Sequence, residues 1–195
     1  MRKLFNLKRL IVFIILISGY VFWQRDTYAR YFEFRQLCDA GNGLELYEKV
    51  EKNQVWQADT LSEAQGYAQG LKSVMFVRAP DPQGRLVDVR YKGGTWGDRD
   101  SYSLTPSDLS VKPKYRIRTS FIGSISEDHR IWKTVIEVTN LSVHSVAYRW
   151  TQYTFKWRHQ DRFFQSLFVP SGFIECPATT GEARTKEFNQ KTFKD

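Results

Sequence analysis

Histidine is scarce in this chain, and the motifs that most often mark an active site are missing. The three histidines, at positions 129, 144 and 159 of 195, are too dispersed for a metal-ligand motif. The sequence contains no His-Glu-x-x-His helix, no Gly-x-Ser-x-Gly elbow and no dinucleotide-binding fingerprint. The glycine-rich segment 93–97 lacks the lysine of a phosphate-binding loop, so we interpret it as a turn. The sequence therefore predicts no catalytic residue, no metal site and no cofactor, and we expect a protein that is not an enzyme.

A large excess of positive charge is also missing outside the N-terminal region. The formal net charge is +8, from 29 basic and 21 acidic residues. Residues 1–30 hold six of the basic residues and one acidic residue, which accounts for +5 of that total. A nucleic-acid-binding domain carries its positive charge on the folded part of the chain. We therefore expect no nucleic-acid partner. The aromatic content of 15% predicts a core that is rich in aromatic side chains and contains a sheet.

The longest hydrophobic run, Leu10–Trp23, contains no ionisable residue. As a helix it would span roughly 21 Å, which is less than the ~30 Å hydrocarbon core of a bilayer. Apolar residues before the run and long basic side chains beside it would extend this length. A cleaved signal peptide and a buried core helix are the alternatives, but residues 24–30 offer no good cleavage site. We therefore predict an uncleaved transmembrane anchor at residues 10–23.

The charges on either side of this run give a predicted orientation. Four basic residues precede the run, whereas residues 24–30 hold two basic residues and one acidic residue. By the positive-inside rule, residues 1–9 form a cytoplasmic basic segment and the chain from residue 24 onward is exported. The sequence thus predicts a single-pass protein of a bacterial inner membrane whose C-terminal domain faces the periplasm.

The two cysteines, Cys38 and Cys176, both lie beyond the predicted anchor. Two thiols in an exported domain are interpreted first as a disulfide. The bond would close a loop of over a hundred residues, which the chain-entropy model values at roughly 4 to 5 kcal/mol. Two buried free thiols or a redox pair are the alternatives, and no Cys-x-x-Cys spacing supports the latter.

Two helices are predicted after the hydrophobic run. Residues 26–37 lack proline and glycine and can continue as a helix, which should end at Gly41-Asn42-Gly43. Thr60-Leu61-Ser62-Glu63 has the pattern of a capping box at the start of a second helix. Apolar residues at helical spacing follow it on one face.

Alternating patterns in the second half predict strands over 74–78, 85–91, 115–125, 132–138 and 146–157. In the last of these, the aromatic residues change parity after Trp150. A β-bulge near Thr151-Gln152 is one explanation, and a strand covered on both faces is the other. We expect an α+β fold over residues 24–178, in which the early helices pack on an antiparallel sheet of roughly five strands. Residues 179–195 are polar and predict a flexible tail.

One surface stands out among the predicted strands. Arg116, Arg118 and Lys133 lie on the outward side of neighbouring strands, with Glu137 as the acid between them. Such a face could bind an anionic partner. An ordinary solvated face has the same pattern, and that alternative stays open.

A short segment resembles part of a known group of proteins. In residues 37–50, Cys38 is followed by Gly41, by Leu44, Leu46 and Tyr47, and by Val50. This arrangement is similar to one in small single-pass bacterial envelope proteins of uncharacterised function. The general plan also resembles the NTF2-like periplasmic subunits of type IV secretion systems, by analogy alone.

From these observations we expect a binding or scaffolding role in the cell envelope, with the membrane and a protein as partners. A secretion-system component and a periplasmic enzyme without a recognisable motif are the alternatives. A pocket that gathers titratable side chains would favour the enzyme. An exposed apolar patch or an open sheet edge would favour a protein partner.

Overall fold

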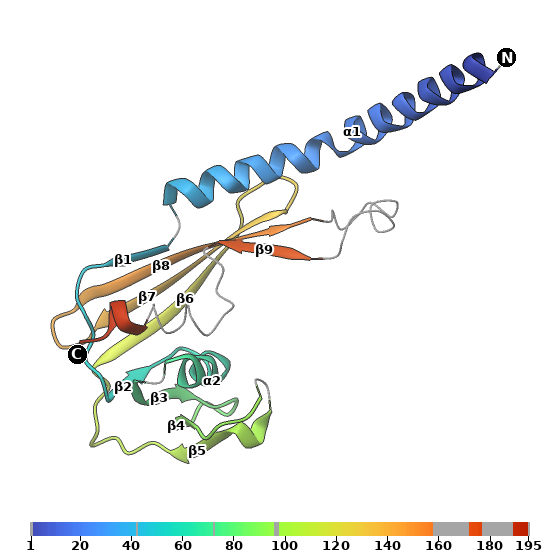
Figure 1. Ribbon diagram of the computed structural model, residues 1–195. Helices are drawn as coiled ribbons and strands as arrows, with labels where there is room; N and C mark the ends of the chain where they lie inside the picture. Colours follow the sequence, from blue (N-terminus) through green and yellow to red (C-terminus); the bar gives the residue numbers. More distant parts are fainter. Residues whose placement is uncertain are drawn as a thin grey trace.

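The computed structural model describes residues 2–41, 43–71, 73–95, 98–157, 172–176 and 189–194, without the side chains of residues 2–10, 23 and 99. These residues form a nine-stranded sheet with a long helix on one face and a short helix on the other (Figure 1). The elements are α1 (Arg2–Gly41), β1 (Gly43–Leu46), β2 (Gln54–Gln57), α2 (Leu61–Gly70), β3 (Val74–Pro80), β4 (Leu86–Tyr91), the 3-10 helix η1 (Arg99–Ser101), β5 (Tyr102–Pro106), β6 (Tyr115–Ser124), β7 (Ile131–Asn140), β8 (Ser145–Lys156) and β9 (Phe173–Cys176).

The sheet is mixed, which corrects the predicted antiparallel sheet of roughly five strands. Its strand order is β1-β8-β7-β6-β2-β3-β4-β5, and β9 also pairs with β8. Strand β2 runs parallel to both of its neighbours, β3 and β6, and the other pairs are antiparallel. The parallel pairing follows from the β2–α2–β3 connection, because a helix that crosses over the sheet returns the chain in the same direction. Strands β2, β5 and β9 were not predicted, because four or five residues are too few to show a period.

Helix α1 crosses the predicted boundary at residue 23 without a break. Its C-terminal half packs on the sheet and buries Gln24, Thr27 and Phe34, while its N-terminal half extends away from the sheet (Figure 1). Within the part of the chain that the structure describes, no helix combines the length and the apolar character needed to span a bilayer. This finding contradicts the predicted anchor at Leu10–Trp23 and the inner-membrane location that was based on it. The apolar run, at about 21 Å, is shorter than a bilayer core.

Strand β8 is covered on both faces, so the predicted bulge at Thr151-Gln152 is wrong. Its pairing with β7 stays in register from Phe155 to Tyr148, and the shift lies beyond that point. Tyr148 belongs to the main core under α2, whereas Tyr153 and Phe155 lie in a second core under α1. The aromatic residues before and after the change of parity therefore lie on opposite faces of the strand, and both faces are buried.

The C-terminal residues return to the main core, which corrects part of the predicted flexible tail. Val50 and Phe193 form a parallel bridge, and the buried ring of Phe193 stacks on Trp56 at a centroid distance of 6.0 Å. Residues 179–188 and 195 of that predicted tail lie outside the described residues.

The predicted disulfide is confirmed between Cys38 and Cys176, whose Cα atoms are 5.8 Å apart. Cys38 lies in the last turns of α1, before that helix ends at Gly41 as predicted, and Cys176 ends β9. The bond thus fixes the end of α1 to a strand on the outer edge of β8.

The predicted N-cap at Thr60 is also confirmed, but the Glu63 carboxylate binds β6 and the Thr60 hydroxyl. Thr60 has an extended backbone, and its Oγ1 accepts a hydrogen bond from the backbone N–H of Glu63 at 3.2 Å. Glu63 Oε1 in turn accepts from the backbone N–H of Thr119 on β6 at 3.2 Å. The cap therefore both starts α2 and places it on the sheet.

Replacing Thr60 by alanine should lower the free energy of unfolding by about 1 kcal/mol, because the amide of residue 63 loses its acceptor. Thr60→Ser keeps the hydroxyl and is the matched control, with a smaller loss expected. Urea unfolding of both variants measures the difference. Equal stability of the serine and alanine variants would show that the cap contributes nothing.

Candidate functional site

The predicted basic surface is divided in the structure. Arg116 Nη2 lies 2.7 Å from Asp59 Oδ1, and Arg118 Nε lies 3.1 Å from Asp59 Oδ2. Lys133 instead lies over the ring of Tyr153, with Nζ 5.9 Å from the ring centroid. Burial raises the pKa of the Asp59 carboxyl, but the hydrogen bonds from both arginines outweigh it and hold that pKa below its ordinary value. Two of the three basic residues are therefore paired with the carboxylate of Asp59. The binding of an external anionic partner to this surface stays a prediction.

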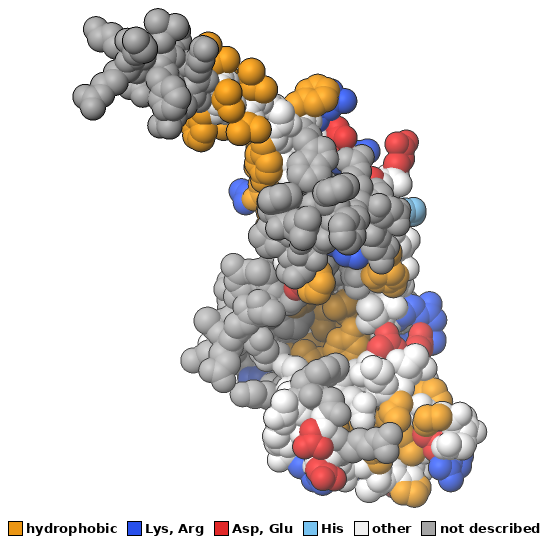
Figure 2. All heavy atoms as spheres, turned by 90° about the vertical axis from the view of Figure 1, so that its right-hand side faces the viewer, with side chains coloured by type: hydrophobic (Ala, Val, Ile, Leu, Met, Phe, Trp, Pro, Cys, Tyr) orange, Lys and Arg blue, Asp and Glu red, His pale blue; other side chains and the backbone are white. Residues whose placement is uncertain are grey.

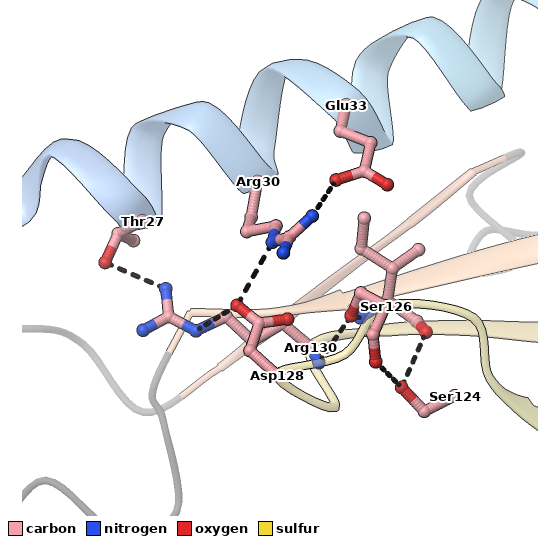
Figure 3. A network of polar contacts seen from close by, with 8 residues as sticks. Thr27, Arg30, Glu33, Ser124, Ser126, Asp128 and Arg130 are labelled. Atoms are coloured by element: carbon pink, nitrogen blue, oxygen red, sulfur yellow. Dashed lines mark hydrogen bonds and ion pairs between the residues drawn. The ribbon is translucent and has the colours of Figure 1, made fainter.

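A polar network joins α1 to the hairpin between β6 and β7 (Figure 3). The buried Arg130 donates from Nη1 to Thr27 Oγ1 at 2.8 Å, and its Nε lies 3.4 Å from Asp128 Oδ2. Arg30 reaches the same carboxylate oxygen at 3.5 Å and also donates to Glu33 at 2.6 Å. The network pairs each positive charge with a carboxylate and so holds α1 against the hairpin. It contains no side chain that could act as a nucleophile with an adjacent base.

Within the described residues, no three histidine, cysteine or acidic side chains come close enough together to hold a metal ion. The turn positions of His129 and His144 have positive φ angles of 56° and 53°. Both residues therefore serve as turn residues in the left-handed region.

An ion pair in which both partners are buried lies at the other end of the sheet, on β3 and β4. Arg78 and Asp88 are each 4% exposed. The guanidinium donates from Nε to Asp88 Oδ1 at 2.8 Å and from Nη2 to Asp88 Oδ2 at 3.2 Å, which is a bidentate pair. It also donates to the backbone carbonyls of Val111 and Asp108, both at 2.8 Å. Arg78 therefore connects the sheet to the loop that follows β5.

That loop, residues 107–112, is fixed by further hydrogen bonds. Ser107 Oγ donates to Asp88 Oδ1 at 2.7 Å. Asp108 Oδ1 accepts from the hydroxyl and the backbone N–H of Ser110, at 2.7 and 2.9 Å, and these bonds lower the pKa of Asp108. Leu109, between these anchored residues, is 70% exposed. The loop is thus rigidly held by a buried arginine and projects an apolar side chain into solvent.

Other large apolar side chains are exposed around this loop: Leu86, Leu104 and Val111. Leu86 is bonded to the loop through its carbonyl oxygen, which accepts from the Ser107 N–H at 3.2 Å. Figure 2 shows hydrophobic side chains at the surface of this end of the molecule, between polar and charged ones. We call β5 together with residues 107–112 the β5 surface.

The β5 surface has the features of a recognition site. A loop whose conformation is already fixed loses little conformational entropy when it binds. An exposed apolar side chain on it gains from burial against a partner. The strand at its edge offers backbone hydrogen-bonding groups.

Comparison with protein-family models, with curated proteins and with solved structures finds no match. The resemblance of residues 37–50 to small envelope proteins stays a prediction.

The sequence analysis missed this site, although one signal was present. The strands 74–78 and 85–91 were predicted with a loop between them. In the hairpin that the structure shows, Arg78 lies opposite Asp88. An opposite-charge pair inside two apolar strands would have indicated a buried ion pair. The contacts from Arg78 to residues 108 and 111 depend on the path of the later loop and could not have been predicted.

Proposed function

We propose that the chain is a binding or scaffolding protein that holds a protein partner at the β5 surface. The observation that carries this proposal is the buried guanidinium of Arg78, which fixes a loop whose Leu109 is 70% exposed. Burying a charged pair has a large desolvation cost. An arrangement that stabilised only the core would need no exposed leucine at the tip of the loop. The proposal explains both features together.

The disulfide supports a site of action in an oxidising compartment, because such bonds form and persist there. A partner would then belong to the same compartment.

The test is site-specific photo-crosslinking in cells that make the chain. A photoreactive amino acid replaces Leu109 in one variant and Val143 in the other. Val143 is the matched control because it is also a large apolar residue at 62% exposure, in the turn between β7 and β8. We expect a discrete protein adduct from position 109 and none from position 143. Adducts of equal yield at both positions, or none at position 109, would refute the proposed function.

A further inference from the structure

Helix α2 covers only part of the sheet face on which it packs. Its contact with β6 reaches Thr119, whose Oγ1 lies 2.5 Å from the hydroxyl oxygen of Tyr67. Thr119 is paired with Ile136 of β7, which packs against the main core. Beyond this row, towards the turn between β6 and β7, the same face of the sheet continues. Figure 2 shows a hollow in the middle of the molecule, with hydrophobic side chains on its floor.

Five side chains form this continuation of the face. Side chains alternate along a strand, and directly opposite residues of neighbouring strands share a face. The next row is Phe121, Thr134 and Gln152, and the row after it is Trp132 and Thr154. None of the five is buried, and Phe121 is 64% exposed. We call these five residues the open face.

The two aromatic residues of the open face form one apolar platform. Phe121 and Trp132 stack with their ring centroids 5.3 Å apart and their planes at 25°. An exposed aromatic pair leaves a large apolar area in contact with water. Covering this area with a ligand is therefore favourable.

The other three residues place neutral hydrogen-bonding groups beside the platform. Thr134 and Thr154 have hydroxyl groups, and Gln152 has an amide with two donor hydrogens and an acceptor oxygen. Thr134 lies directly opposite Phe121, and Gln152 lies directly opposite Thr134. Among the residues that the structure describes, none occupies these three side chains with a hydrogen bond. The groups are therefore available to a ligand that lies on the platform.

The strands beneath the open face are held from the other side of the sheet. Ile131, Tyr153 and Phe155 are buried in the second core, under α1. Cys38 belongs to the same core and is bonded to Cys176 at the end of β9. The open face therefore has a fixed shape before a ligand binds, which reduces the entropy lost on binding.

We propose that the open face binds a neutral saccharide. A sugar ring has a C–H face that packs on an aromatic platform, and it has hydroxyl groups that bond to threonine and glutamine side chains. A wholly apolar ligand would cover Thr134 and Gln152 without giving them a partner, which costs free energy. A ligand with only polar groups would gain nothing from Phe121 and Trp132. Ligand sites in proteins commonly combine an apolar lining with a few polar groups in this way.

The charges around the open face favour a neutral ligand. Glu63 and Glu175 lie at two of its borders, beside Thr119 and Thr154, and would repel an acidic sugar. Both oxygens of Glu63 already accept hydrogen bonds, from the Thr119 N–H and the Thr60 hydroxyl, and Glu175 is also engaged. A cationic ligand therefore finds no free carboxylate there.

The test is isothermal titration calorimetry of the full oxidised chain with neutral tetrasaccharides: cellotetraose, maltotetraose and the tetramer of N-acetylglucosamine. We expect at least one of them to bind at millimolar concentration or below. Phe121→Ala should weaken that binding about tenfold, because the sugar loses half of its platform. Phe32→Ala is the matched control, since Phe32 is also 64% exposed but lies on α1, and it should leave the affinity unchanged.

A second pair of variants tests the polar contribution. Gln152→Leu keeps the approximate size of the side chain and removes its hydrogen-bonding groups. It should weaken binding about fivefold, the effect of one lost hydrogen bond. Gln36→Leu makes the same change on the exposed side of α1 and should have no effect. Urea midpoints show that each variant is folded.

Any of three results would overturn the saccharide site. The first is that none of the tetrasaccharides binds at millimolar concentration. The second is equal affinity in Phe121→Ala and Phe32→Ala, which would place the sugar elsewhere on the chain. The third is unchanged affinity in Gln152→Leu, which would mean that the face binds by apolar contact alone. The open face and the β5 surface lie on different strands of the sheet, so this proposal and the crosslink expected at position 109 fail separately.

Discussion

Replacing Arg78 by methionine should lower the free energy of unfolding by about 3–5 kcal/mol, because it leaves a buried carboxylate without its partner. Asp88 is 4% exposed and receives two hydrogen bonds from the guanidinium. Methionine fills much of the same volume, so the loss reports the unpaired charge and not a cavity. The carbonyls of Asp108 and Val111 lose their donor in the same variant. Urea unfolding measures the loss.

The chain provides a control with the same chemistry at the surface. Arg85 lies 2.8 Å from Asp81, but its side chain is 76% exposed. Arg85→Met should have a much smaller effect than Arg78→Met, because solvent screens an exposed pair. A second control removes both charges, Arg78→Met with Asp88→Leu, and should recover much of the stability. Equal losses for Arg78→Met and Arg85→Met would show that burial does not determine the strength of the pair.

The Arg78 variant also tests how the loop is held. If the guanidinium fixes residues 107–112, amide hydrogen exchange at Ser110 and Val111 should become faster in Arg78→Met than global unfolding explains. Exchange at Val77 in the core should change only with global stability. Unchanged exchange in the loop would mean that the Asp108–Ser110 bonds suffice to fix it. The basis of the proposed function would then be lost.

The parts of the fold that the sequence predicted well depend on local signals. The N-cap of α2 needs only Thr60 and the backbone N–H of Glu63, three residues apart. The β6–β7 hairpin follows from two alternating runs and a turn between them. The disulfide was predictable because two cysteines leave a single pairing.

The parts that were missed depend on contacts between distant segments. The second buried face of β8 exists because α1 packs there. The change of aromatic parity after Trp150 allowed this cover, but a local pattern cannot distinguish it from a bulge. The apolar run at Leu10–Trp23 was interpreted by itself, as a separate anchor. In the structure it is part of a helix whose later turns are fixed to the sheet by Thr27 and Phe34. The β5 surface likewise requires the positions of three segments at once: β3, β4 and the loop after β5.

Removing the disulfide should have the other large effect on stability. Cys38 and Cys176 are 138 residues apart in the chain. The chain-entropy model gives a loss of about 5 kcal/mol for a loop of this length. We expect this loss in the double variant Cys38→Ala with Cys176→Ala, and in the natural chain after reduction. Urea unfolding with and without a phosphine reductant measures it.

The same samples also show which part of the folded chain depends on the disulfide. Reductant should leave the stability of the double variant unchanged, which controls for effects of the reductant on other groups.

The residues beyond Cys176 have an independent attachment, because Phe193 is buried beside Trp56 in the main core. Opening the bond should therefore release β9 and the end of α1 first, while the Trp56 core stays intact until global unfolding. Amide exchange should become faster at Ile174 in the reduced chain at urea concentrations where Val77 stays protected. If the two amides lost protection together, α1, β9 and the main core would form one cooperative unit.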